Sequence, residues 1–332
     1  MTTNDKPKFG MYWASSCGGC EIAVLNIHEK LLDVDANFEV VFWPVAMDAK
    51  IKDVEAMPDK SITLTLFNGG MRTNENEEMA HLLRRKSQIL VSFGSCATEG
   101  CVPGLLNLSS VQSALDYVYS GSPSTDNPQN IRPQANWDAP EGQLHLPTLS
   151  PVLKTLDQVV PVDYYMPGCP PESKQIGAVI DLVIKVLHGE ASLPAAGSTI
   201  GAGVSTVCDE CPRTRNVKSI HKFMRIQDVK EIDPTLCLLE QGIPCNGPAT
   251  RSGCGSLCPN ASAQCIGCYG PAEGVVDFGA RLMTAFASVI DSNDPAEINR
   301  ILDGIPDPAG QFYRFNLAKS LLRSSKQAWK GQ

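Results

Sequence analysis

Two kinds of hydrophobic pattern alternate along the first half of the chain. Short apolar runs predict buried strands over residues 8–13, 38–45, 62–67, 88–93 and 159–166. Between the runs, Ile22, Leu25 and Leu32 recur at helical spacing and predict a helix over 21–32, and further helices are predicted from Asn74 onward and over 176–187. Strands that alternate with helices predict an α/β fold with a doubly wound parallel sheet, whose ligands bind at the carboxyl ends of strands.

Two segments depart from this alternation. Residues 120–151 carry six prolines and little periodicity, which predicts a long surface loop or insertion. Residues 191–204 are rich in Gly, Ala and Ser, and predict a linker between one domain over 1–190 and a second over 191–332. Helices are expected again late in the chain, over 278–289, from Asp294-Pro295 onward and over 315–326.

Composition narrows the class of protein. With 332 residues, 43% of them hydrophobic, the chain can form two domains with apolar cores. A net charge of −8 argues against a nucleic-acid partner, because neutralising a phosphate backbone needs clustered Lys and Arg. The amino terminus is polar and no apolar run approaches the length of a membrane span, so we expect a cytoplasmic protein without a membrane anchor.

Thirteen cysteines give the strongest chemical signal. Disulfides are rare in a reducing cytosol, so metal binding is favoured over a disulfide framework. Cys17 and Cys20 lie on a glycine-containing loop directly after the first strand, and Cys96 and Cys169 follow two later strands. Because the carboxyl ends of parallel strands share one edge of the sheet, these four thiols are expected to form a single four-ligand centre.

Eight further cysteines lie within 61 residues that show little periodicity: Cys208, Cys211, Cys237, Cys245, Cys254, Cys258, Cys265 and Cys268. Metal binding can supply the folding free energy that such a segment lacks. Two structural zinc sites in a zinc-stabilised interaction module are one interpretation. Iron–sulfur centres are favoured, because the first domain gathers its cysteines from three distant loops at the ligand-binding edge of a sheet.

Four motifs carry a resemblance to a known family. The segments Cys17-Gly18-Gly19-Cys20-Glu21, Gly94-Ser95-Cys96-Ala97-Thr98 and Gly168-Cys169-Pro170-Pro171 resemble the proximal-cluster motifs of nickel–iron hydrogenase small subunits. The run from Cys237 to Pro271 is similar to the cytoplasmic branch, and within it to the methyl-viologen-reducing hydrogenases of methanogens and their bacterial relatives. The resemblance implies a flavodoxin-like domain followed by a small, irregular cluster domain, and an electron-transfer subunit with no catalytic residue of its own.

The resemblance also implies cofactors, ligands and partners. Three 4Fe–4S clusters are implied, with the ligands Cys17, Cys20, Cys96 and Cys169 (proximal), Cys254, Cys258, Cys265 and Cys268 (medial), and Cys208, Cys211, Cys237 and Cys245 (distal). A large subunit would carry the nickel–iron site. A small iron–sulfur adaptor and a heterodisulfide reductase-like complex would accept the electrons, although deazaflavin- or NAD(P)-linked modules serve other members of the branch.

Two residues beside these motifs, Cys101 five residues beyond Cys96 and Glu21 next to Cys20, have no assigned role. Cys101 is expected to be a packed free thiol, because Gly19 stands where oxygen-tolerant relatives carry the companion of such a cysteine. Glu21 is either a proton carrier near the large subunit or an ordinary acid in the first turn of a helix. The related subunit of respiratory complex I is a weaker match, because it normally has adjacent cysteines and no eight-cysteine extension.

Overall fold

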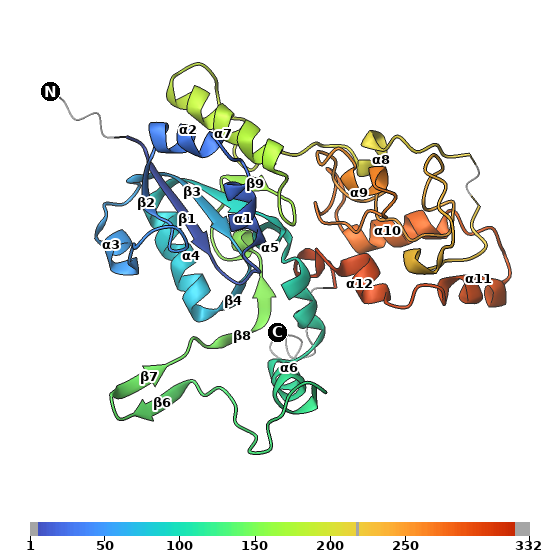
Figure 1. Ribbon diagram of the computed structural model, residues 1–332, viewed down its shortest axis with the longest axis horizontal. Coiled ribbons are helices and arrows are strands. Elements are labelled where there is room, and N and C mark those ends of the chain that lie inside the picture. Colours follow the sequence, from blue (N-terminus) through green and yellow to red (C-terminus); the bar gives the residue numbers. More distant parts are fainter. Residues whose placement is uncertain (1–5, 217–218, 323–332) are drawn as a thin grey trace.

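A five-stranded parallel sheet forms the centre of the first region, by which we mean the part of the chain predicted as a domain over 1–190; the second region is the part that follows it (Figure 1). The computed structural model describes residues 6–216 and 219–322. The strand order is β2-β1-β3-β5-β9, which is the flavodoxin-like order of a doubly wound sheet. This confirms the predicted fold class. The bounds are β1 Lys8–Trp13, β2 Glu39–Phe42, β3 Ile62–Asn68, β5 Ser87–Phe93 and β9 Tyr164–Met166.

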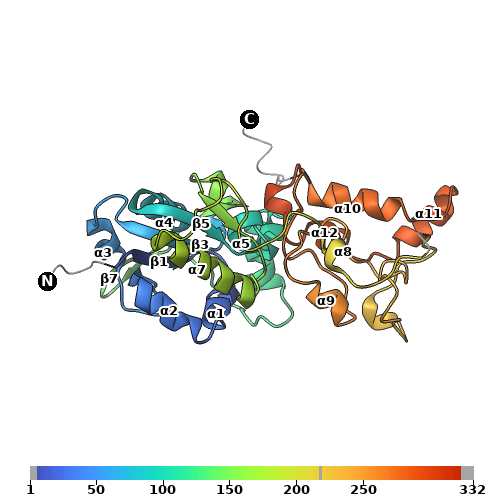
Figure 2. The same cartoon turned by 90° about the horizontal axis from the view of Figure 1, so that it is seen from above.

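Helices cover both faces of this sheet (Figure 2). One core packs the sheet against α1 (Gly19–Leu25), α2 (Lys30–Asn37) and α7 (Ser173–Leu187). The other core packs it against α3 (Ile51–Ala56), α4 (Asn74–Lys86) and α5 (Ser95–Glu99). The predicted helix near Asn74 is confirmed, with Thr73 as its N-cap.

The predicted helix over 21–32 is wrong in two respects. The chain turns at His28, which has a positive φ of 55°, so two short helices replace one long one. Ile22, Leu25 and Leu32 are exposed, whereas Ala23 and Val24 pack in the core. Helical spacing identified an apolar face but could not show that this face points away from the sheet.

The two segments predicted as loop and linker are more ordered than expected. Residues 120–151 contain an antiparallel hairpin, β6 (Asn136–Ala139) and β7 (Gly142–His145), and the start of β8 (Leu149–Lys154), which pairs with β4 (Met71–Thr73). Residues 191–204 do not form a free linker, because part of the segment lies along β9. The backbone N–H of Ile200 donates to the Tyr165 carbonyl oxygen over 2.8 Å.

The second region has a separate apolar core built on short helices. The predicted helices at Phe278 and Asp294-Pro295 are confirmed, but the one over 315–326 is wrong: the chain forms only a short 3₁₀ turn, and residues 323–326 lie outside the described part. No helix among the described residues is long and apolar enough to cross a bilayer. The α-helices of this region are α8 Val207–Glu210, α9 Leu257–Asn260, α10 Phe278–Ala287, α11 Pro295–Leu302 and α12 Pro308–Tyr313. One further α-helix, α6 Val111–Asp116, lies in the first region, followed by a π-helix, η2 Tyr117–Gly121. The 3₁₀ helices are η1 Val102–Leu108, η3 Leu156–Gln158, η4 Ile226–Asp228 and η5 Leu317–Lys319.

Candidate metal centres

Three loops at the carboxyl edge of the sheet meet around the first cysteine group. The backbone N–H groups of Gly94 and Ser95 donate to the carbonyl oxygens of Met166 and Gly168, each over 2.8 Å. Gly94 has a φ of 80°, and a Cβ atom there would lie 2.3 Å from the Cys20 sulfur. Only glycine therefore lets the β5 loop pass so close to this thiol.

The four cysteines of this group lie close enough for their charges to interact. Burial raises the pKa of Cys20, and Cys96, Cys169 and Cys17 raise it further. Cys17 is exposed, whereas Cys20 and Cys96 are buried. The structure thus brings together the four thiols that the sequence placed at one edge of the sheet. Cys101 is buried beside them, as expected for a packed thiol.

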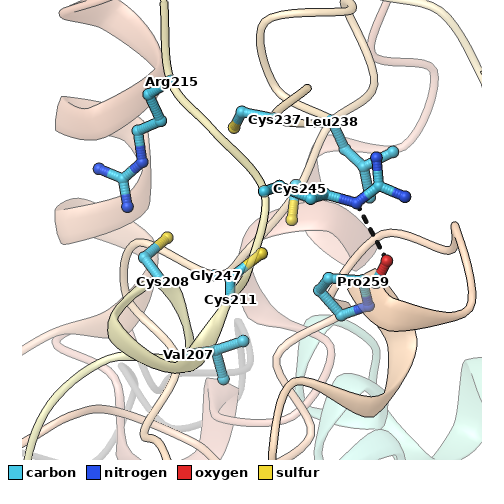
Figure 3. A pocket seen from close by; sticks show the side chains of 10 residues that line it. Val207, Cys208, Cys211, Arg215, Cys237, Leu238, Cys245, Gly247 and Pro259 are labelled. Atoms are coloured by element: carbon cyan, nitrogen blue, oxygen red, sulfur yellow. Dashed lines mark hydrogen bonds between the residues drawn. The ribbon is translucent and has the colours of Figure 1, made fainter. Parts of the chain in front are cut away.

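A second group of four cysteines surrounds one cavity in the second region. Figure 3 shows Cys208, Cys211, Cys237 and Cys245 around this space, with Arg215 nearby. Gly247 forms part of the wall, and a Cβ atom there would lie 3.1 Å from the Cys208 sulfur. Burial raises the pKa of Cys208 to about 12 and that of Cys245 to about 11. Protonated thiols are therefore favoured at these two positions, and binding a metal group would release their protons.

The remaining four cysteines lie between the other two groups. Burial raises the pKa of Cys268 to about 12, and Cys254, Cys169 and Cys258 raise it further. Burial also raises the pKa of Cys265, which is close to both Cys245 and Cys268. The third group thus has one neighbour, Cys169, in the first group and another, Cys245, in the second.

Direct hydrogen bonds join the three groups. Ser95, the residue before Cys96, accepts from the Gly168 N–H over 3.0 Å and donates to the Cys268 carbonyl oxygen over 2.5 Å. The Cys265 N–H donates to the Cys245 sulfur over 3.4 Å. In the sequence, Ser95 stands out only as part of a motif, and its contact with Cys268 was not predictable because the partners are 173 residues apart.

Glu21 is held in the core beside the first group. It is 2% exposed, and its Oε2 accepts from the Trp43 indole N–H over 2.5 Å. Burial raises the pKa of this carboxyl, while the hydrogen bond from Trp43 and the nearby Asn68 amide oppose the shift. Glu21 does lie in the first turn of α1, where it is buried, and Trp43 is a supporting residue that the sequence did not indicate.

The donor chemistry of all three groups fits iron–sulfur clusters. Each group offers four thiols, and no imidazole or carboxylate is needed to complete a set. Within residues 6–216 and 219–322, no three His, Cys, Asp or Glu side chains are positioned to hold a single metal ion. Glycines at 94 and 247 leave space beside the sulfurs that a side chain would fill.

Comparison with known proteins gives consistent matches. Residues 17–183 match the family described as "NADH ubiquinone oxidoreductase, 20 Kd subunit". The chain is 37% identical to an iron–sulfur subunit of the F420-non-reducing hydrogenase of Archaeoglobus profundus, over 95% of this chain and 97% of that protein. It is 32% identical to a subunit of the F420-non-reducing hydrogenase of Methanothermobacter marburgensis, over 96% of each. The nickel–iron–selenium hydrogenase of Desulfovibrio vulgaris Hildenborough has the same fold, at 15% identity and a TM-score of 0.52 over 81% of this chain and 95% of that one.

Proposed function

The chain belongs to the family of hydrogenase small subunits, with subunits of F420-non-reducing hydrogenases as relatives, and we propose that it relays electrons from dihydrogen oxidation through three 4Fe–4S clusters. It is thus an oxidoreductase subunit whose nickel–iron site would lie on a separate large subunit. The observation that carries this proposal is the row of three cysteine quartets, with Cys268 beside Cys169 and Cys265 beside Cys245.

The ligand sets follow this grouping. The proximal cluster would be held by Cys17, Cys20, Cys96 and Cys169, the medial by Cys254, Cys258, Cys265 and Cys268, and the distal by Cys208, Cys211, Cys237 and Cys245. The separate apolar cores support two domains, for which we propose 1–190 and 191–332; Leu193 and Ile200, just beyond this boundary, still pack against the first core. When bound, the clusters supply one-electron carriers. The chain fixes their positions, shields ten of the twelve proposed ligands at least partly from solvent and, at Ser95 and Cys265, connects neighbouring groups by hydrogen bonds.

The two ends of this row suggest where partners bind. Exposed apolar residues, Trp13, Ile22 and Leu25, lie on the segments that flank Cys17, and would meet the large subunit. At the other end, a cavity of about 170 Å³ is lined by Cys208, Cys237 and Cys245 with Ile220 and Val289. We assign this end to the electron acceptor, a small iron–sulfur adaptor followed by a heterodisulfide reductase-like complex, in the cytoplasm. A deazaflavin- or NAD(P)-linked acceptor is the alternative.

Anaerobic purification of the native complex tests this function. We expect about twelve iron atoms and as many sulfides per chain, since each 4Fe–4S cluster contributes four of each. Dihydrogen-dependent dye reduction should require the large subunit. Zinc in place of iron would support an interaction module instead. Dye reduction by the isolated chain, free of nickel, would contradict the assignment of the nickel–iron site to a partner.

A further inference from the structure

A long arm projects from the first region (Figure 1). We define it as residues 109–150, which contain α6, η2 and the β6–β7 hairpin. None of these forty-two consecutive residues is buried. The arm nevertheless carries large apolar side chains that are more than one-third exposed: Tyr117, Val118, Ile131, Trp137, Leu144, Leu146 and Leu149.

The hairpin of the arm has one apolar and one polar face. Trp137 pairs directly with Leu144 across the strands, and their side chains are 57% and 58% exposed. The pairs on either side, Asn136 with His145 and Asp138 with Gln143, point to the opposite face because side chains alternate along a strand. The Asn136 Oδ1 and His145 Nδ1 atoms lie 2.7 Å apart. The hairpin thus has the pattern of a half-buried sheet, but no part of the described chain covers its apolar side.

Such an arm is held by polar contacts, among them the Arg132–Asp116 ion pair, and not by apolar burial. A two-stranded hairpin is marginally stable in water, and ordering its residues costs conformational entropy that apolar burial must offset. Here that burial is missing within the described part of the chain. An exposed apolar face of this kind marks an interaction surface.

The base of the arm is hydrogen-bonded to the carboxyl edge of the sheet, the edge that carries the proposed proximal ligands. At one end, the Asn107 side chain forms two hydrogen bonds with the Leu153 backbone, of 2.8 and 3.0 Å. At the other, β8 pairs with β4, which follows Gly70. Gly70 exchanges two backbone hydrogen bonds with Ser15, two residues before Cys17. The base of the arm is therefore joined through these hydrogen bonds to the loop that carries Cys17.

We propose that the apolar face of the hairpin, Trp137 with Leu144, packs on the large subunit beside the edge of the sheet that carries Cys17. We call this contact the clasp. This inference rests on the proposed function, which places the large subunit over Cys17. The arm and the second region extend in different directions from the sheet (Figure 1), so an acceptor at the distal group lies away from the arm. The polar face, with Asp138 and Gln143, stays in water.

Site-specific photo-crosslinking in the assembled complex tests the clasp. A benzophenone amino acid is placed at position 137 on the apolar face, and at position 138 on the polar face as a matched control. We expect a crosslink to the large subunit from position 137, at least tenfold stronger than from position 138. A crosslink from 137 to a second copy of this chain or to the acceptor, equal yields from both positions, or no crosslink at all in an intact complex would overturn the proposal.

A pair of double variants separates this proposal from the proposed function. Trp137→Ser with Leu144→Ser should release the large subunit at least tenfold more readily on dilution, with iron per chain unchanged. Asp138→Ser with Gln143→Ser should behave as the unsubstituted protein. If the unsubstituted chain carries iron and holds its large subunit, and the apolar-face variant holds it equally well, the clasp is wrong and the proposed function stands. If the unsubstituted chain binds no large subunit, the proposed function itself fails.

Discussion

The sulfur atom of Cys101 lies 3.5 Å from the sulfur atom of Cys169. Cys101 is 1% exposed, and its φ of 49° with a ψ of −155° is a backbone conformation that residues other than glycine rarely adopt. The hydrogen bond from Cys101 lowers the pKa of Cys169. A fifth thiol is thus placed to donate to a proposed proximal ligand rather than to replace one.

This contact predicts an effect on the proximal potential. Hydrogen bonds to cluster sulfurs help to set reduction potentials, so Cys101→Ala, which removes the donor, should lower the proximal potential on the order of tens of millivolts. Cys101→Ser keeps a donor and should restore most of the shift. Redox titration followed by EPR measures both variants. An Ala variant with the original potential, or one with a proximal cluster that has lost iron, would rule out this donor role.

A second prediction concerns the hydroxyl that joins the two regions. Ser95→Ala leaves the Gly168 N–H and the Cys268 carbonyl without their buried partner, which should cost about 1–3 kcal/mol of stability. The Gly168 N–H lies in a proximal loop and the Cys268 carbonyl in a medial loop. Losing the hydroxyl between them should therefore also weaken the magnetic interaction between the proximal and medial clusters. Thermal unfolding and EPR of the reduced complex report the two effects. Ser95→Thr keeps the hydroxyl and serves as the control; an Ala variant with the stability and spectrum of the unsubstituted chain would show that the bridge is unimportant.

The sequence predicted the sheet and its cysteine loops because both depend on local patterns. Each strand of the sheet is a short apolar run, and Cys17, Cys96 and Cys169 each follow one closely, whereas Cys20 lies in the first turn of α1. The orientation of the first helix was not predictable, since Ile22 and Leu25 follow the same periodicity whether that face meets the core or a partner. The contact between Ser95 and Cys268 was equally out of reach, because spacing along a chain says nothing about how two separate cores dock.

A third prediction concerns pH. Glu99 lies at the end of α5 and packs against Gly270, where a Cβ atom would come within 2.9 Å of its Cγ. Burial raises the pKa of this carboxyl, and Asp157 adds to the shift, whereas Lys319 and Arg251 oppose it. Lys319 also forms a 2.8 Å ion pair with Asp157. The folded chain therefore binds the Glu99 proton more tightly than the unfolded chain does.

The sign of the pH effect follows from this difference. The contribution of Glu99 is most favourable below the usual glutamate pKa and is lost as the pH rises through the raised, folded-state value. Glu99→Gln cannot ionise, so its melting temperature should fall less between pH 4 and pH 8 than that of the unsubstituted chain. Glu55→Gln, at an exposed position, is the control. If the melting temperatures of the Glu99→Gln variant and the unsubstituted chain fall by the same amount between pH 4 and pH 8, the prediction is contradicted.

The last prediction concerns the medial ligand set. Cys258 is exposed and lies at the second residue of α9. The backbone N–H groups of a first helical turn have no partner within the helix, so Cys258→Pro should leave the local fold intact. Cys254, Cys265 and Cys268 would then hold a cluster that lacks one corner iron. The loss of one iron and one thiolate changes cluster type and charge, and should raise the medial potential on the order of a hundred millivolts or more.

A raised medial potential has a distinct kinetic consequence. Electrons would be retained between the proximal and distal groups, so transfer to a low-potential acceptor should slow markedly while reduction of a high-potential dye changes little. Cys258→Ala, which removes the thiol without altering the backbone, should reproduce both effects if the ligand is the cause. EPR of the oxidised variants should show the signal of a three-iron cluster. If both variants keep an unchanged 4Fe–4S signature at the medial site, Cys258 is not its ligand, and the division of the eight carboxy-terminal cysteines into these two quartets is wrong.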